Sequence, residues 1–97
     1  MAEEKITGKT SSGFEYSIDK RVLTDMEVVD DIYEIFHNSQ ESMLSPLLTK
    51  ILGKEQKKAL YDHVRDADGF VSTQLVCTEL GEILNGAGKQ DSDVKNS

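Results

Sequence analysis

The stretch RDADGFVS, residues 65–72, is the part of this 97-residue chain that comes closest to a metal-binding pattern. Asp66, Asp68 and Gly69 match the middle of an EF-hand loop, where oxygen atoms surround calcium and a glycine makes the turn. In that register the first and twelfth loop positions fall on a valine and a leucine. A loop without these two acidic ligands cannot complete a calcium shell. The sequence therefore favours a turn between two helices, with a degenerate calcium sensor as the alternative.

No other combination of side chains indicates catalysis. His37 and His63 belong to different expected helices, and neither has a metal-ligand spacing to Cys77, the single cysteine. Cys77 lies between the apolar residues Val76 and Leu80, so we expect a buried, unreactive thiol. The sequence predicts a protein that is not an enzyme, with no catalytic residues, no metal site and no cofactor.

The charge balance limits the partners. Eighteen acidic and eleven basic residues give a net charge of -7. This disfavours nucleic acid and anionic membranes, because phosphate binding needs a concentrated basic surface. No apolar run reaches the roughly 18 residues that span a bilayer, and the opening MAEEK does not resemble a signal peptide. A single cysteine fits a reducing compartment, so we expect a small, acidic, cytoplasmic protein.

Residues 5–18 predict a β-hairpin. Phe14, Tyr16 and Ile18 alternate with polar residues, which is the period of a half-buried strand. Gly13 follows two serines and supplies the turn, since glycine adopts positive φ easily. Because a lone hairpin is marginal in water, its apolar face should pack on helices or pair with another chain.

The helix after the hairpin has a clear N-terminal signal, LTDMEV. Thr24 is expected to cap it, with Glu27 reaching back as the second half of a capping box. Leu23 and Val28 form the matching hydrophobic staple. The helix should end near His37, and it carries five acidic residues but no lysine or arginine.

Three further helices are expected. A proline starts a short apolar helix over 46–52, and a glycine ends it. The next helix covers 54–65. Beyond the turn, Ser72 caps a last helix over 73–85, which Gly86 stops in the left-handed conformation.

These elements predict a mainly α fold. We expect a small four-helix domain with an N-terminal β-hairpin over residues 1–86. Residues 87–97 lack apolar periodicity and are expected to form a flexible, disordered acidic and polar tail.

Two helical segments carry more apolar residues than one buried face needs. Residues 44–52 are apolar on more than one side. The helix before them has an apolar stripe at helical spacing: Met26, Val29, Tyr33 and Phe36. Such a surplus indicates either a central buried helix or a surface for a partner, and the sequence leaves both open.

A partner surface of this kind would be a groove that receives a helix. Charge or alanine changes at Leu47 and Leu48, in the middle of this groove, should abolish partner binding and leave the protein folded. If such variants unfold, these residues belong to the core. The candidate partner-binding residues are Tyr33, Phe36, Leu44, Leu47, Leu48 and Ile51, with Leu47 and Leu48 in the middle.

The charges are unevenly distributed along the chain. The first helix is acidic, whereas residues 54–65 carry four basic residues against two acidic ones. These two helices could face each other within the fold or between copies, or they could be ordinary solvated faces. We also expect self-association, through the hairpin edge or the charged helices.

The order of segments resembles a known family. SGFEYSID leads to LTDMEVVDDIYEI, then to GKEQKKALYDHVRDADGFVS and a last helix ending in EILNG. This order is similar to the small tail assembly chaperones of long-tailed phages and prophages of Gram-positive bacteria, over residues 11–86. The most specific matches are Gly53, Glu55, Gln56, Leu60, His63, Arg65, Asp68, Gly69 and Val71.

The resemblance implies a protein of the bacterial cytoplasm that is absent from the finished virion. Such chaperones bind the long helical tape measure protein, keep it soluble and help the major tail protein to polymerise around it. A longer frameshifted product often exists in the family, and no catalytic residues carry over. The alternatives are a minor structural protein of the head–tail junction or tail, and a small acidic regulatory protein that binds a host protein.

Overall fold

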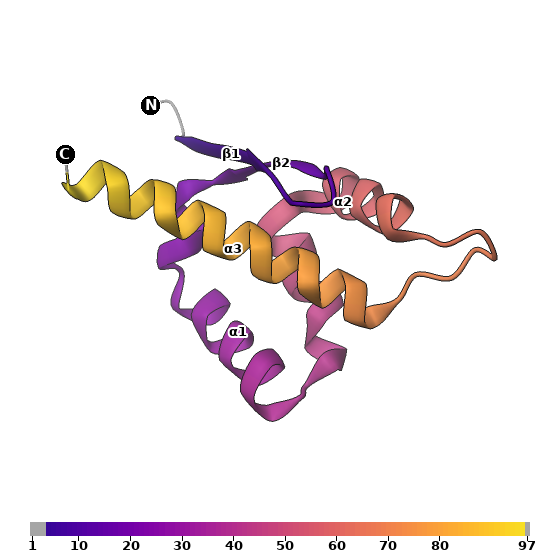
Figure 1. The fold of residues 1–97 in the computed structure, drawn as a ribbon. Coiled ribbons are helices and arrows are strands. Elements are labelled where there is room, and N and C mark those ends of the chain that lie inside the picture. Colours follow the sequence, from indigo (N-terminus) through magenta and orange to yellow (C-terminus); the bar gives the residue numbers. More distant parts are fainter. Residues whose placement is uncertain (1–3, 97) are drawn as a thin grey trace.

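A computed structural model describes the backbone of residues 4–96 and the side chains of residues 4–88. The chain forms a two-stranded antiparallel hairpin, two short 3-10 helices and three α-helices (Figure 1). The elements are β1 (Lys5–Lys9), β2 (Glu15–Asp19), η1 (Lys20–Thr24), α1 (Met26–Asn38), η2 (Glu41–Met43), α2 (Leu44–Val64) and α3 (Thr73–Asn96). This mainly helical fold with an N-terminal hairpin confirms the predicted fold class.

The hairpin has the predicted strands and turn. Ile6 stands opposite Ile18, and Gly8 stands opposite Tyr16. Gly13 has a φ of 98° in the turn, a conformation that glycine adopts without steric cost. The alternating aromatic and aliphatic side chains of β2 are buried, so one face of the hairpin lies on the helices.

Helix α1 begins one residue later than the sequence indicates. Its N-cap is Asp25, whose carboxylate accepts hydrogen bonds from the backbone N–H groups of Glu27 and Val28. Thr24 instead ends η1 and donates its hydroxyl to the carbonyl of Arg21 at 3.0 Å. The predicted capping box at Thr24 is therefore wrong, because the adjacent aspartate is an equally good cap.

Helix α2 contains both helices predicted on either side of Gly53. This glycine has φ 81° and ψ 164°, which is far from helical and kinks α2 at the predicted boundary. The helix starts at Leu44, two residues before Pro46, and the proline is tolerated within the first turn.

The turn between α2 and α3 has the predicted conformation. The Asp66 carboxylate accepts hydrogen bonds from the N–H groups of Asp68 (2.9 Å) and Phe70 (3.0 Å), and Gly69 takes a φ of 91°. The Ser72 hydroxyl then accepts a hydrogen bond from the N–H of Leu75 at 3.3 Å. Aspartate, glycine and serine here close a turn and cap a helix.

Helix α3 does not stop at Gly86, and the predicted stop there is wrong. The helix continues to Asn96, and Ala87 is fully buried. A Cβ atom on Gly86 would lie 2.7 Å from the hydroxyl oxygen of Tyr16, so this glycine makes room for a ring. The flexibility expected for 87–97 stays a prediction, since the side chains beyond residue 88 lie outside the described part.

All three α-helices and the hairpin contribute to a single core. In Figure 1, α3 crosses the molecule with the hairpin on one side and α1 on the other. The kinked α2 contacts α1, α3 and β2. The buried apolar residues are Ile6, Phe14, Tyr16, Ile18, Val28, Ile35, Leu44, Leu47, Leu48, Ile51, Leu52, Leu60, Val76, Leu80, Ile83 and Ala87. Within the described residues, no helix has both the length and the apolar character needed to cross a bilayer.

Candidate functional site: an exposed apolar stripe on an acidic helix

The structure separates the six candidate partner-binding residues into two groups. The four from α2 are enclosed by their own chain, with exposed fractions of 6% for Leu44, 1% for Leu47, 0% for Leu48 and 4% for Ile51. They do not form the open groove expected from the sequence, because the hairpin, α1 and α3 cover more than one side of α2. The two aromatic residues of α1 have the opposite environment.

Tyr33 and Phe36 belong to an exposed apolar stripe that runs the length of α1. Their exposed fractions are 54% and 44%, and those of Met26 and Val29 are 65% and 44%. The spacing of three and four residues places all four side chains on one face. We call these four residues the α1 stripe. Large apolar side chains in a continuous row on the surface are typical of an interaction site.

The Tyr33 ring stacks on His37, with ring centroids 4.5 Å apart and an interplanar angle of 14°. Stacking one turn apart on the same helix restricts the rotamers of both rings. A ring that is already ordered loses less conformational entropy when a partner covers it. The centre of the α1 stripe is therefore a preorganised aromatic surface.

Helix α1 also carries carboxylates beside the α1 stripe. Lys50 reaches from α2 to Asp25 (3.3 Å) and Glu27 (3.2 Å) at the start of α1. The hydrogen bond from Lys50 lowers the pKa of Asp25, and the two carboxylates raise the pKa of Lys50. Among residues 4–88, no basic side chain pairs with Asp30 or Glu34 farther along the helix, so the middle of α1 keeps a net negative charge.

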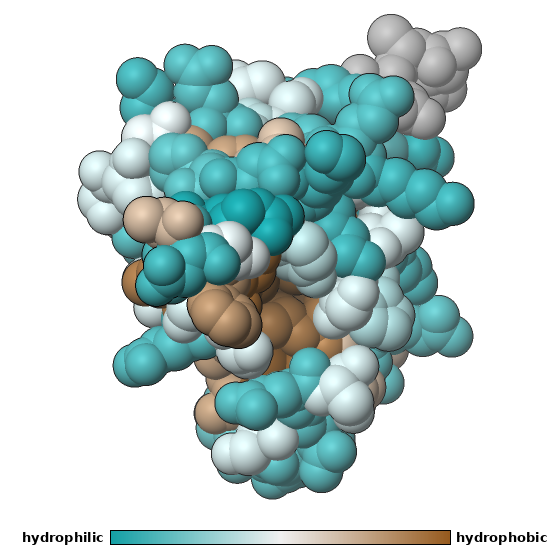
Figure 2. All heavy atoms as spheres, turned by 90° about the vertical axis from the view of Figure 1, so that its right-hand side faces the viewer, coloured by the Kyte–Doolittle hydropathy of each residue, from teal (hydrophilic) through white to brown (hydrophobic). Residues whose placement is uncertain are grey.

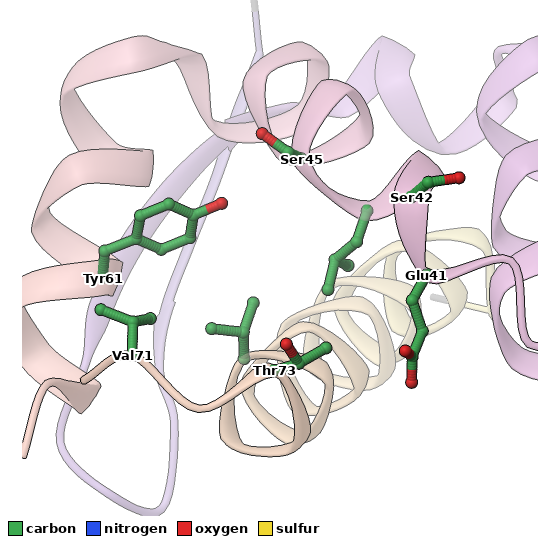
Figure 3. Close-up of a pocket in the computed structure, with 8 residues that line it drawn as sticks. Glu41, Ser42, Ser45, Tyr61, Val71 and Thr73 are labelled. Atoms are coloured by element: carbon green, nitrogen blue, oxygen red, sulfur yellow. The ribbon is translucent and has the colours of Figure 1, made fainter.

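A second apolar surface lies on the face that carries the turn between α2 and α3. Figure 2 shows hydrophobic surface at the bottom of a hollow in the middle of this face, surrounded by hydrophilic residues. The hollow has a volume of about 400 Å³. Tyr61 and Val71 lie on one side of it, and Glu41 and Ser42 lie on the other (Figure 3). Leu44 is the one candidate residue from α2 that borders this hollow.

A polar cluster holds the hairpin turn against the helices, and no spacing pattern in the sequence predicts it. The Ser12 hydroxyl donates to the carboxylate of Glu79 at 2.7 Å and lies 2.9 Å from Nε2 of His63. Since the hydroxyl has one proton and gives it to Glu79, His63 acts as the donor to Ser12. Activation of a serine nucleophile requires a histidine that accepts this proton. The cluster therefore positions the turn rather than preparing a nucleophile.

Glu79 is nearly enclosed, at 5% exposure, although it is a carboxylate. Its second oxygen, Oε1, is buried without a hydrogen-bond partner among the described residues. Beside it, the carboxylate of Glu82 accepts hydrogen bonds from the N–H and the hydroxyl of Ser11, and these bonds lower the pKa of Glu82. Two neighbouring turns of α3 thus attach the tip of the hairpin.

Cys77 is half-buried, and its environment keeps the thiol protonated. Burial raises the pKa of Cys77, and the carboxylate of Glu41 raises it further. A raised pKa reduces the thiolate fraction, which is the nucleophilic form. Within the described residues, no three or more histidine, cysteine, aspartate or glutamate side chains lie together in a way that could hold a metal ion.

No protein family, curated protein or solved structure matches the chain.

Proposed function

We propose that the chain is a non-catalytic tail assembly chaperone of a long-tailed phage or prophage, acting in the cytoplasm of the bacterial host. Its client is the tape measure protein, and the major tail protein is a further partner during assembly of the tail tube. The order of segments described above resembles that family. The observation that carries the proposal is the α1 stripe, because it offers an ordered apolar surface to a helical client.

The α1 stripe replaces the leucines of α2 as the binding surface in this proposal. A client helix can place its own apolar side chains along Met26, Val29, Tyr33 and Phe36 without opening the core of the chaperone. Burying side chains of this size contributes roughly 1.5–3 kcal/mol each when they are fully covered. The net charge of -7 keeps the chaperone and its complex soluble.

Coexpression tests this function. The tape measure protein of the phage or prophage that carries the gene is produced alone, with the wild-type chain, or with the Tyr33→Ser/Phe36→Ser double variant. We expect the wild-type chain to bring the client into the soluble fraction and to copurify with it. The double variant should lose both effects because it removes the two aromatic contacts.

The matched control is Phe70→Ser, which changes a residue of 71% exposure in the turn before α3. This variant should behave as the wild type. A folded double variant that still solubilises the client would refute the role of the α1 stripe. The protein should also be missing from purified virions; its presence there would favour a minor structural protein.

A further inference from the structure

The carboxylates of α1 are arranged along one side of the α1 stripe. Successive residues of a helix are rotated by about 100°, which places Asp30 and Glu34 next to the α1 stripe on its side away from the core. Val28 and Ile35, on the other side of the stripe, are buried in the core. Asp30 is one turn from both Met26 and Tyr33, within reach of any side chain that covers them. The exposed face of α1 is therefore an apolar row with an acidic border.

No basic side chain among residues 4–88 neutralises this acidic border. Helix α1 has no lysine or arginine, and Lys50 is bound at its first turn by Asp25 and Glu27. Glu34 accepts a hydrogen bond from the neutral side chain of Asn38 at 3.1 Å. No ion pair in the described residues involves Asp30 or Asp31. A partner that covers the stripe without supplying positive charge would desolvate these carboxylates at a cost.

We propose that the α1 stripe binds an amphipathic helix whose apolar face is bordered by lysine or arginine on one side. The stripe extends over eleven residues, and the rise of about 15 Å from Met26 to Phe36 is nearly three turns of a partner helix. Apolar residues at positions i, i+3 or i+4, and i+7 of the partner fit this length. Its basic residues, on the flank that faces Asp30 and Glu34, form ion pairs with these two carboxylates, which have none among residues 4–88.

Charge selects this partner over a second copy of the chain. Antiparallel pairing of two α1 stripes would place both acidic borders on the same side of the pair, and pairing in either orientation joins molecules that each carry a charge of -7 and leaves Asp30 and Glu34 without a basic partner from α1, which has no lysine or arginine. An anionic membrane would be repelled in the same way. A basic amphipathic helix gains from both the apolar and the electrostatic contact.

The inference concerns the surface of the proposed function and names the chemistry of the client segment, but its test needs no tail protein. The probe is a fluorescein-labelled 21-residue model peptide with leucine at the a and d positions of three heptads and lysine at b and e, which border the apolar face on one side. A second peptide has glutamate in place of every lysine. A third has the composition of the first in an order without periodicity. Fluorescence anisotropy measures the binding of each to the full chain.

We expect the lysine peptide to bind at least tenfold more tightly than either control peptide. Raising the salt concentration should weaken its binding, since screening reduces attraction between exposed charges. Tyr33→Ser should weaken binding at least fivefold, and Phe70→Ser should leave it unchanged. Equal binding of the lysine peptide and its scrambled form would overturn the inference, because it would show charge attraction alone.

Charge reversal gives a second, independent readout. The double variant Asp30→Lys/Glu34→Lys should bind the glutamate peptide in preference to the lysine peptide, with a circular dichroism spectrum like that of the wild type. An unchanged preference in this folded variant would refute the acidic border as the determinant. Should the peptides behave as expected while the tape measure protein stays insoluble, the proposed function fails and the inference stands. If the tape measure protein becomes soluble while the lysine peptide and its scrambled form bind equally, the inference fails and the proposed function stands.

Discussion

The side-chain amide of Gln56 pairs with the backbone of Ser17 as a neighbouring strand would. The N–H of Ser17 donates to Oε1 of Gln56 at 2.8 Å, and Nε2 of Gln56 donates to the carbonyl of Ser17 at 2.6 Å. The same Nε2 group also donates to the carbonyl of Leu52, next to the kink in α2. One side chain thus pairs with both backbone groups of Ser17 and connects β2 to α2.

Removing this amide should destabilise the fold. In Gln56→Ala, the N–H and C=O of Ser17 stay partly buried without these partners, and each such loss costs about 1–3 kcal/mol. We expect a clear decrease in the free energy of unfolding, measured by urea denaturation. The control is Gln74→Ala, a change at an exposed glutamine of α3. If the two variants are equally stable, the pairing of Gln56 with Ser17 contributes nothing.

The buried leucines of α2 and the aromatic residues of α1 should respond differently to truncation. Leu48 is fully buried, so Leu48→Ala should cost roughly 2–5 kcal/mol of unfolding free energy by leaving a cavity. Tyr33→Ala, at a residue of 54% exposure, should change stability by less than about 0.5 kcal/mol. Thermal unfolding followed by circular dichroism distinguishes them. A stable Leu48→Ala variant would contradict the enclosed position of α2.

A double-mutant cycle tests the contact between Gly86 and Tyr16. Alanine favours a helix over glycine by about 1 kcal/mol, but its Cβ at position 86 would lie 2.7 Å from the Tyr16 hydroxyl. Gly86→Ala should therefore destabilise the wild type. In a Tyr16→Phe background the hydroxyl is gone and the nearest ring carbon is 4.0 Å away, so the same change should stabilise. An identical effect in both backgrounds would disprove the steric explanation.

Acid should weaken the junction between β2 and η1. The side chain and backbone N–H of Arg21 donate to the Asp19 carboxylate and lower its pKa from 3.8 to about 2. Because the pKa is lower in the folded state, this stabilisation is complete above the unfolded pKa and is lost as the pH falls through about 2.

The measurement for this effect is urea denaturation of the wild type and of Asp19→Asn between about pH 5 and pH 2. The wild type should lose more stability over this range than the variant, which has no carboxyl group to titrate at position 19. Asp25 and Glu82 also have lowered pKa values and should give the variant a residual acid dependence. Parallel curves would show that Asp19 is not linked to folding.

Local signals in the sequence predicted the elements of the fold well. The alternation around Tyr16, the turn at Gly69 and the cap at Ser72 are properties of a few adjacent residues, and all three are present. Gly86 shows where such reasoning fails. A glycine can end a helix or make space for a distant ring, and only the position of Tyr16 distinguishes the two.

The location of the candidate site depended on information that the sequence does not contain. Apolar periodicity identified both the α1 stripe and the surplus in residues 44–52, but it does not say which one the other elements cover. Leu47 is enclosed because α2 contacts α1, α3 and the hairpin, whereas Tyr33 is left 54% exposed by the part of the chain that the structure describes. The cluster around Glu79 joins residues too far apart in the sequence to form a recognisable pattern.

The bonds between Ser11 and Glu82 connect positions 71 residues apart. During translation the hairpin leaves the ribosome well before α3, and two isolated strands have little stability of their own. Its anchoring carboxylates are translated only with α3. Until α3 folds against it, the hairpin lacks these anchors, and the outer edge of β1 is accessible to other nascent chains.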